Sequence, residues 1–509
     1  MTRTAKLLLV PVLLLQIVFF SFIALHRFID GDEGFYLLAS RLILMHKKPY
    51  LDFFYTQAPL LPYVYAIWMK CTAVSWVSAK LFSASLTALL GSLLYEHVCR
   101  LTRSWLAAVA AVILFASSTL IFAFFPVVKT YSLAGLFLFA AYVVVGRLSA
   151  ASPRWLIGTG GLLFGLGADT RSYLLLLAPL FLWWISRNSD AGTRRASILW
   201  FLGGFTIAMF PCLYLFVYSP DAFLFNNLGY HAIRSDDGLI GMWGEKLVAF
   251  LEFFLGYQGG SNGIQDSILF VISFAFVSSI RKQRYPPRFA FQIAFVLSII
   301  SILPTPVHPQ YFCLCIPFLI VTAVCVVNDL LAELEKSRSR LLAAAACVAL
   351  FGIYVATSAN DFRRYLVTGD GVPGLRQDIE KGGWKLQSVL EVSQAIDQIA
   401  FPGEAVASFW PGYIFQTKAI PFPGLENDFG VPCAERLSSE RRTRYHIVSW
   451  EEIESDFASR RPRIVVLGNP NRLMDRAAGD TTKSWLRVDG YTLARSMGDT
   501  SIYVCCAKP

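Results

Sequence analysis

The chain has 509 residues, of which 55% are hydrophobic, 15% aromatic and only 16% charged. An ordinary soluble domain carries about 25% charged residues, so this composition excludes a soluble globular enzyme, a disordered chain and a disulfide-dense secreted domain. The net charge of +10 falls wholly on residues 1–360, because residues 361–509 hold 19 basic and 19 acidic side chains. We therefore expect a membrane domain over residues 1–358 and a soluble domain over residues 359–509.

Apolar runs predict about eleven transmembrane helices, since a helix needs about 20 apolar residues to cross a bilayer. The first run, residues 7–25, follows Arg3 and Lys6 as a signal peptide would, but no small-residue cleavage site comes after it. We expect it to be a retained span. The other runs are residues 76–98, 105–125, 130–147, 155–169, 172–186, 197–218, 265–280, 289–304, 311–328 and 341–358.

The basic residues predict the orientation of these spans, because cytoplasmic loops are enriched in Lys and Arg. With the N-terminus in the cytoplasm, an odd number of spans places residues 359–509 outside. Most acidic residues then fall in outer loops, and no basic patch interleaved with aromatic residues indicates nucleic-acid binding. The basic residues of the predicted inner loops are Arg100, Arg103, Arg147, Arg154, Arg187, Arg194, Arg195, Arg281, Lys282, Arg284, Arg288, Lys336, Arg338 and Arg340.

The first outer loop, residues 26–75, carries the most informative polar cluster. Asp30, Asp32 and Glu33 follow directly after the first span, where a low dielectric suits one of them as a base. Helical spacing begins at Glu33, so the Asp32 carboxylate is expected to accept bonds from free backbone amides as an N-cap. On the residues alone, catalytic base and helix cap remain equally open for Asp32. Residues 47–63 are amphipathic and are expected to lie along the outer surface.

Several cations are predicted at the outer ends of spans, where they could hold an anionic group. A charge within a span is rare and usually functional, and Lys129 and Arg171 come closest to that condition. The alternative for each cation is a side chain that merely extends to the interface. Asp169 could instead pair with Arg171 in a purely structural role. The candidate cations are Lys129, Arg171, Arg234, Lys246 and His308.

The tail after residue 359 predicts a small α/β or α+β domain. Residues 384–400 have helical spacing, residues 404–410 and 463–469 indicate buried strands, and residues 491–497 and 501–507 indicate an antiparallel pair. No glycine-rich phosphate loop or nucleophile elbow is present in the tail, so we expect a lid or docking domain. Its cysteines are Cys433, Cys505 and Cys506, and Cys433 could form one disulfide.

Short motifs in this chain resemble those of GT-C glycosyltransferases. The run Asp32-Glu33-Gly34-Phe35-Tyr36, with Pro49-Tyr50, Asp52-Phe53-Phe54 and Ala58-Pro59-Leu60, resembles their first outer loop. Gly165 to Arg171 and His308-Pro309-Gln310-Tyr311-Phe312 are weaker matches further along the chain. The most similar groups are the dolichyl-phosphate-mannose protein mannosyltransferase-like enzymes, including lipid A aminoarabinose transferases, and the rhizobial lipopolysaccharide core transferases. The chain departs from the aminoarabinose transferases at Gln57, where they have a Lys.

The resemblance implies a GT-C type α-helical polytopic membrane protein with a small C-terminal α/β extracytoplasmic domain. It implies transfer of a sugar from a polyprenyl-phosphate donor to a hydroxyl of a lipid, glycan or protein acceptor on the outer face of the membrane. A bacterial inner membrane is expected, with the N-terminus cytoplasmic and the C-terminal domain periplasmic. No cofactor is certain, and a divalent metal remains open.

The same resemblance implies roles for individual residues. Asp32 is the expected base, and Glu33 is expected to orient it or to bind the acceptor. The other expected donor- or acceptor-binding residues are Tyr36, Asp52, Gln57, Lys129, Arg171, His308 and Tyr311.

Two rival functions remain open: a polytopic transporter or flippase for a lipid-linked or anionic substrate, and a non-catalytic assembly protein. Transporters tend to show inverted repeats and polar-lined spans at mid-membrane. Here the polar residues gather at the predicted outer ends, which favours glycosyl transfer.

Overall fold

The computed structural model describes residues 3–148, 152–235, 237–238, 241–255, 261–277, 285–334, 338–370, 372, 381–468 and 486–505. The chain divides into two compact units. We call the first the helical unit; it comprises Met1–Ala24, Ser83–Cys212 and Leu239–Arg363. We call the second the mixed unit; it comprises Leu25–Phe82, Leu213–Gly238 and Arg364–Pro509.

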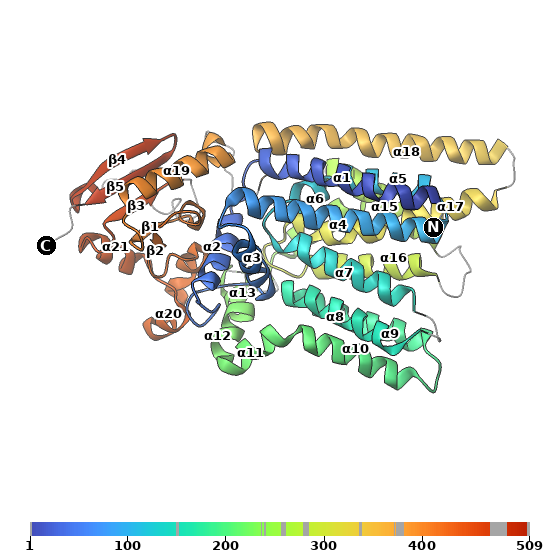
Figure 1. Ribbon diagram of the computed structural model, residues 1–509, viewed down its shortest axis with the longest axis horizontal. Coiled ribbons are helices and arrows are strands. Elements are labelled where there is room, and N and C mark those ends of the chain that lie inside the picture. Colours follow the sequence, from blue (N-terminus) through green and yellow to red (C-terminus); the bar gives the residue numbers. More distant parts are fainter. Residues whose placement is uncertain are drawn as a thin grey trace. The chain divides into compact units, whose positions relative to one another are not determined.

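The helical unit contains long apolar helices and short 3₁₀ segments (Figure 1). Helices α1, α4 and α11 continue from one unit into the other. In chain order the elements are α1 (Arg3–His26), α4 (Trp76–Thr102), α5 (Trp105–Ser117), α6 (Thr119–Phe124), α7 (Thr130–Gly146), α8 (Arg154–Thr170), η1 (Ser172–Leu177), α9 (Ala178–Asn188), α10 (Arg194–Ala208), α11 (Phe210–Tyr218), α14 (Trp243–Leu255), α15 (Ser261–Val277), α16 (Pro286–Ser301), η3 (Pro309–Cys315), α17 (Ile316–Glu333) and α18 (Arg338–Arg363).

All eleven predicted apolar runs fall on helical segments, but not all of them form one long helix. Among the described residues, four helices are long and apolar enough to cross a membrane, and the bent pair α10–α11 would make a fifth. The run 105–125 is interrupted at Ser118, whose backbone is extended, and α10 and α11 meet at a 60° bend. The last three residues of the run 265–280 lie outside the described residues. The exact number of spans remains a prediction.

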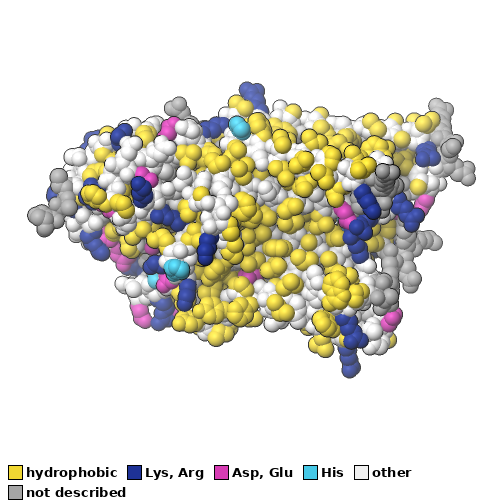
Figure 2. All heavy atoms as spheres, viewed as in Figure 1, with side chains coloured by type: hydrophobic (Ala, Val, Ile, Leu, Met, Phe, Trp, Pro, Cys, Tyr) yellow, Lys and Arg dark blue, Asp and Glu magenta, His cyan; other side chains and the backbone are white. Residues whose placement is uncertain are grey.

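Small residues allow helices of the helical unit to approach closely, as they do in membrane proteins. A Cβ atom at Gly161 of α8 would overlap the carbonyl of Phe201 in α10, and one at Gly204 would overlap the carbonyl of Gly158. Hydrophobic side chains cover much of the visible surface of this unit (Figure 2). Large exposed apolar residues include Leu7, Leu199 and Leu341 at 68%, 68% and 73%, which suits a lipid environment.

The mixed unit contains a five-stranded sheet with the strand order β2-β1-β3-β5-β4. Its strands are β1 (Ala405–Ser408), β2 (Ile420–Pro421), β3 (Ile464–Leu467), β4 (Tyr491–Met497) and β5 (Thr500–Cys505). Strand β1 pairs in parallel with β2 and β3, and β5 pairs antiparallel with β3 and β4. The predicted buried strands and closing hairpin are therefore confirmed, except that residues 469 and 506–507 lie outside the described residues.

Helices and short turns complete the mixed unit (Figure 1). The predicted helix over residues 384–400 is α19 (Leu386–Ile399). The other elements are α2 (Glu33–Leu44), α3 (Leu60–Cys71), α12 (Pro220–Leu224), η2 (Phe225–Gly229), α13 (Tyr230–Ile233), η4 (Arg364–Thr368), η5 (Lys381–Trp384), η6 (Pro411–Tyr413), η7 (Asp428–Arg436), α20 (Ser439–Tyr445) and α21 (Trp450–Ala458).

The first loop packs tightly on the C-terminal segment within the mixed unit. The Trp410 indole donates a hydrogen bond to the Gly31 carbonyl at 2.8 Å, and a Cβ atom at Gly34 would lie 2.5 Å from the Gly412 nitrogen. The Arg41 guanidinium donates to the carbonyls of Ile414 and Ala419, each at 2.7 Å. These contacts explain why residues 25–82 belong to the same compact unit as the tail.

The expected surface position of residues 47–63 is wrong. Phe53, Phe54 and Tyr55 are 2%, 1% and 0% exposed. The Tyr55 backbone N–H donates to the Asn226 side chain at 2.9 Å, and helix α3 begins only at Leu60. The aromatic residues that made this segment look amphipathic are core residues of the mixed unit.

Candidate functional site

Asp32 lies at the N-cap of α2, but its side chain does not cap the helix. The predicted cap is therefore wrong. A different local bond is present: the Asp30 Oδ1 accepts the Asp32 backbone N–H at 3.0 Å. Asp30 and Glu33 are both 0% exposed, whereas Asp32 is half-buried. Of the three acids, Asp32 alone has a side chain that a substrate can reach.

Glu33 is held in a buried ion pair with Lys80. The Lys80 Nζ lies 2.9 and 3.0 Å from the two carboxylate oxygens, and both side chains are 0% exposed. The Asp30 backbone N–H donates to Glu33 Oε1 at 3.0 Å. Burial raises the pKa of Glu33, but the charges of Lys80 and Arg27 and the backbone bond outweigh it, so the pKa lies below its usual value. The geometry thus favours an orienting role for Glu33 over direct binding of an acceptor.

Lys80 was not identified from the sequence as a site residue. It lies in the first turns of α4, inside a run otherwise expected to be membrane-spanning. A charged residue in such a run is the signal that could have identified it. Its partner is 47 positions away in the chain, so spacing alone could not connect the two.

The other predicted residues of the first loop, Tyr36, Asp52 and Gln57, make contacts within the loop. Tyr36 is 6% exposed, and its ring packs on Phe35 at 4.7 Å between centroids. Asp52 accepts the Lys48 backbone N–H at 2.6 Å within a turn. The Gln57 backbone carbonyl accepts a hydrogen bond from the Tyr50 hydroxyl.

A second group of predicted residues surrounds Arg171 in the helical unit. Arg171 directly follows α8 with an extended backbone, and its side chain is 8% exposed. Its Nη1 donates to the Thr130 hydroxyl at 2.6 Å. The guanidinium carbon lies 4.4, 4.7 and 5.6 Å from the ring centres of Tyr131, Tyr173 and Tyr311, which are cation–π distances.

The remaining two candidates adjoin the same cluster. Lys129 precedes Thr130 at the N-cap of α7 and is 2% exposed. His308 is the N-cap of η3, and its ring centre is 5.5 Å from that of Tyr311. The structure therefore brings Lys129, Arg171, His308 and Tyr311 together from three distant stretches of the chain. Tyr131 and Tyr173 belong to the same cluster and were not predicted.

The proposed pairing of Asp169 with Arg171 is not present. Within the described part of the chain, the Asp169 carboxylate accepts its hydrogen bond from the Cys212 thiol at 2.9 Å. Arg171 is instead oriented by Thr130 and the tyrosine rings. Arg171 and Asp169 therefore have different hydrogen-bond partners.

Two further candidate cations have different settings. Lys246 is 1% exposed, and its Nζ donates to the Leu303 backbone carbonyl at 3.0 Å, which favours a structural role. Arg234 is the C-cap of α13.

Cys433 and Cys505 are free thiols, and Cys506 lies outside the described residues. Among the described residues, no group of three or more His, Cys, Asp or Glu side chains is placed to hold a metal ion.

Comparison with solved structures identifies the fold. The crystal structure of ArnT from Cupriavidus metallidurans bound to undecaprenyl phosphate superposes with a TM-score of 0.69 at 13% identity, covering 100% of this chain and 99% of that chain. The apo state of the same protein gives 0.67 at 13% identity, with 99% of each chain covered. No family model and no curated protein matches the sequence. ArnT is a lipid A aminoarabinose transferase of the GT-C family, so the predicted GT-C resemblance is confirmed for the fold.

Proposed function

We propose that this chain is a membrane glycosyltransferase that moves a sugar from a polyprenyl-phosphate donor to an acceptor hydroxyl. The observation that carries the proposal is the likeness of fold over the whole chain to ArnT in complex with undecaprenyl phosphate. A shared fold does not by itself assign a function. The proposal therefore also depends on the two groups of side chains around Asp32 and Arg171.

Asp32 is the proposed general base. As the new C–O bond forms at the anomeric carbon, the Asp32 carboxylate takes the proton of the acceptor hydroxyl. The bond from that carbon to the donor phosphate oxygen breaks, and its electron pair stays on the phosphate. Because a lipid phosphate is already a good leaving group, no general acid is required.

Glu33 and Lys80 position the base without contacting substrate. Lys80 holds the Glu33 carboxylate, Glu33 accepts the Asp30 backbone N–H, and Asp30 accepts the Asp32 backbone N–H. This chain of bonds determines where the Asp32 backbone lies. A pre-oriented base avoids reorganisation during the reaction.

Arg171 is the proposed ligand of the donor phosphate. A guanidinium matches phosphate oxygens with two parallel hydrogen bonds, and its low-dielectric setting strengthens the attraction. The rings of Tyr131, Tyr173 and Tyr311 hold the guanidinium in place, and Lys129 adds a second positive charge nearby. If the Lys that the aminoarabinose transferases have at the position of Gln57 helps to hold the donor phosphate there, another cation must do so in this chain.

The wider setting is part of the proposal. About eleven spans would place the N-terminus in the cytoplasm and residues 359–509 outside, in the inner membrane of a bacterium. Residues 1–358 would form the catalytic membrane domain. The acceptor would be a lipid, glycan or protein hydroxyl on the outer face, and the donor sugar a hexose or pentose.

The test uses the purified full-length protein with radiolabelled polyprenyl-phosphate sugars and an extract of envelope lipids. We expect transfer of label to an acceptor, and a loss of about 10²–10⁴ in rate for Asp32→Asn. Asn keeps the size of the side chain, so a folded but inactive variant is the expected outcome. If no label is transferred but labelled lipid crosses the membrane of a proteoliposome, the chain is a flippase and the proposal fails.

A further inference from the structure

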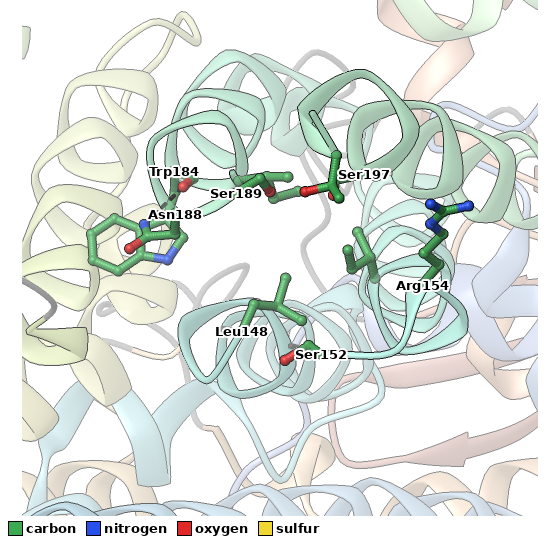
Figure 3. Close-up of a pocket in the computed structure, with 10 residues that line it drawn as sticks. Leu148, Ser152, Arg154, Trp184, Asn188, Ser189 and Ser197 are labelled. Carbon is green, nitrogen blue, oxygen red and sulfur yellow. Dashed lines mark hydrogen bonds between the residues drawn. The ribbon is translucent and has the colours of Figure 1, made fainter. Parts of the chain in front are cut away.

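Two acids line a small cavity in the helical unit. The cavity has a volume of about 10 Å³, and a single water needs about 10–15 Å³ on this measure. Glu252 of α14 and Asp266 of α15 line it together with apolar residues, which are Leu120, Ala249, Phe253, Pro309 and Phe312. A larger cavity of about 80 Å³ in the same unit, with Ser189 and Ser197 on one side (Figure 3), has no acid in its lining.

The Asp266 carboxylate is buried with one oxygen unsatisfied. Asp266 is 1% exposed, and its Oδ1 has no hydrogen-bond partner among the described residues. Its charged neighbour is Glu252, which has the same sign. Protonation of Asp266 would lower the charge but would not satisfy Oδ1, because a protonated oxygen needs an acceptor. A buried oxygen of this kind, in the wall of a cavity, indicates an occupant of that cavity.

Two buried hydroxyls belong to the same neighbourhood. Tyr354 and Ser118 are each 0% exposed, and neither hydroxyl has a partner with hydrogen-bond geometry in the described part of the chain. Tyr354 is an electrostatic neighbour of Asp266 and lies beside Ser118. The polar atoms that surround Asp266 are therefore oxygens. Carboxylate and hydroxyl oxygens suit hard cations better than transition metals that prefer nitrogen or sulfur.

Gln265, the residue before Asp266, holds the surrounding helices together. Its Oε1 accepts the Thr119 backbone N–H at 2.8 Å, and its Nε2 donates to the carbonyls of Ser117 and Tyr354 at 3.0 and 2.8 Å. These bonds connect α15 to α18 and to the break between α5 and α6. Asp266 is thus held on a cross-linked part of α15, and a site formed before the ligand arrives costs less to order.

The charge and size of the cavity favour a divalent cation. None of the described residues that line it is basic, and burying a carboxylate without an opposite charge is costly. One ion of charge +2 neutralises two carboxylates, and the volume fits a single ion rather than an amine carried on a sugar. Two carboxylates with waters are enough for Mg²⁺, and Glu252 is only half-buried, so water can reach the ion from its side.

We propose that Glu252 and Asp266 bind a divalent cation with oxygen ligands between α14, α15 and η3. The η3 segment lines the cavity with Pro309 and contributes Tyr311 to the cluster around Arg171. The cation therefore stabilises the segment that carries Tyr311. Its ligands are not among the side chains proposed to contact the donor or the acceptor, so the site is additional to the proposed transferase site.

The experiment measures Mn²⁺ binding by the detergent-purified full-length protein after metals have been removed with EDTA. Free Mn²⁺ is followed by electron paramagnetic resonance during the titration. We expect one saturable site, from which Mg²⁺ or Ca²⁺ displaces Mn²⁺. Asp266→Asn and Glu252→Gln should each weaken binding about tenfold or more, because loss of even an outer partner of a metal ligand costs about 10–100-fold. Glu245→Gln is the matched control, since Glu245 is an exposed acid in the first turn of α14 that does not line the cavity.

A second measurement separates a bound cation from a shared proton. Millimolar Mg²⁺ or Ca²⁺ should raise the thermal unfolding midpoint of wild type and of Glu245→Gln, but not that of Asp266→Asn. Wild type that binds no Mn²⁺ overturns the proposal, and a more stable Asp266→Asn variant would then indicate that the two acids share a proton.

Mn²⁺ binding that neither cavity variant weakens is adventitious and also overturns the proposal. Should Asp266→Asn fail to fold, Glu252→Gln at the half-buried position decides the question. Both measurements report binding, so their result does not depend on whether the chain transfers sugar.

Discussion

The buried pair of Lys80 and Glu33 allows a quantitative test of the site's architecture. Lys80→Met keeps the length of the side chain but removes the ammonium that donates two bonds to Glu33. Both side chains are 0% exposed, so water cannot replace the lost partner. The variant therefore leaves a buried carboxylate without its main counter-charge.

The expected loss of unfolding free energy is about 3 kcal/mol. Breaking a buried ion pair by removing one partner costs about 3–5 kcal/mol. The lower end applies here because Glu33 keeps the Asp30 backbone bond and the charge of Arg27. The double variant Lys80→Met with Glu33→Met removes both charges, and such apolar replacements are often neutral. Its stability should return to within about 1 kcal/mol of wild type.

The assay is denaturation in detergent followed by tryptophan fluorescence, because Trp76 and Trp410 stack within the mixed unit at 5.8 Å. Lys70→Met is the matched control: Lys70 is exposed on α3, so its loss should cost less than about 0.5 kcal/mol. A stable Lys80→Met variant would refute the reasoning, as would a double variant no more stable than the single one. If the stable double variant also transfers sugar at the wild-type rate, the pair does not position Asp32.

Three further predictions concern other parts of the molecule. Arg171→Ala should weaken donor binding or turnover in a protein that still folds, with partial rescue by Lys; full activity in the Ala variant would remove Arg171 from the site. Gly34→Ala should cost about 1–3 kcal/mol in thermal unfolding, because its Cβ would meet the Gly412 backbone; an unchanged midpoint would contradict this packing. Burial raises the pKa of Glu426 to about 7, so the folded state loses stability as pH rises from about 4.5 through 7. Glu426→Gln should raise the unfolding midpoint at pH 8 and hardly change it at pH 5. Equal changes in the midpoint at the two pH values would contradict a raised pKa of Glu426 in the folded state.

Local features of the sequence were enough to predict the helical segments and the strands of the tail. Apolar runs such as 76–98 and 341–358 require a helix in any membrane setting, since the backbone must satisfy its own hydrogen bonds. The closing hairpin followed from the turn at Gly498, whose positive φ of 59° suits glycine. The short motif around Asp32 indicated the GT-C fold, because its residues are adjacent in the chain and the motif can be recognised before any tertiary contact is known.

Only the tertiary structure decided which side chains meet. The Asp32 side chain was expected to cap α2, but it makes no capping bond, and the Asp32 backbone N–H donates to the Asp30 carboxylate. A run of neighbouring acids does not show which carboxylate accepts which backbone N–H. Lys80 reaches Glu33 across 47 positions. Thr130 and Tyr131 at the start of α7 and Tyr311 of η3 lie around Arg171, which follows α8. Sequence periodicity indicates which face of a helix is buried but not what lies against it. The partners of a buried charge depend on contacts between distant segments, and those exist only once the chain has folded.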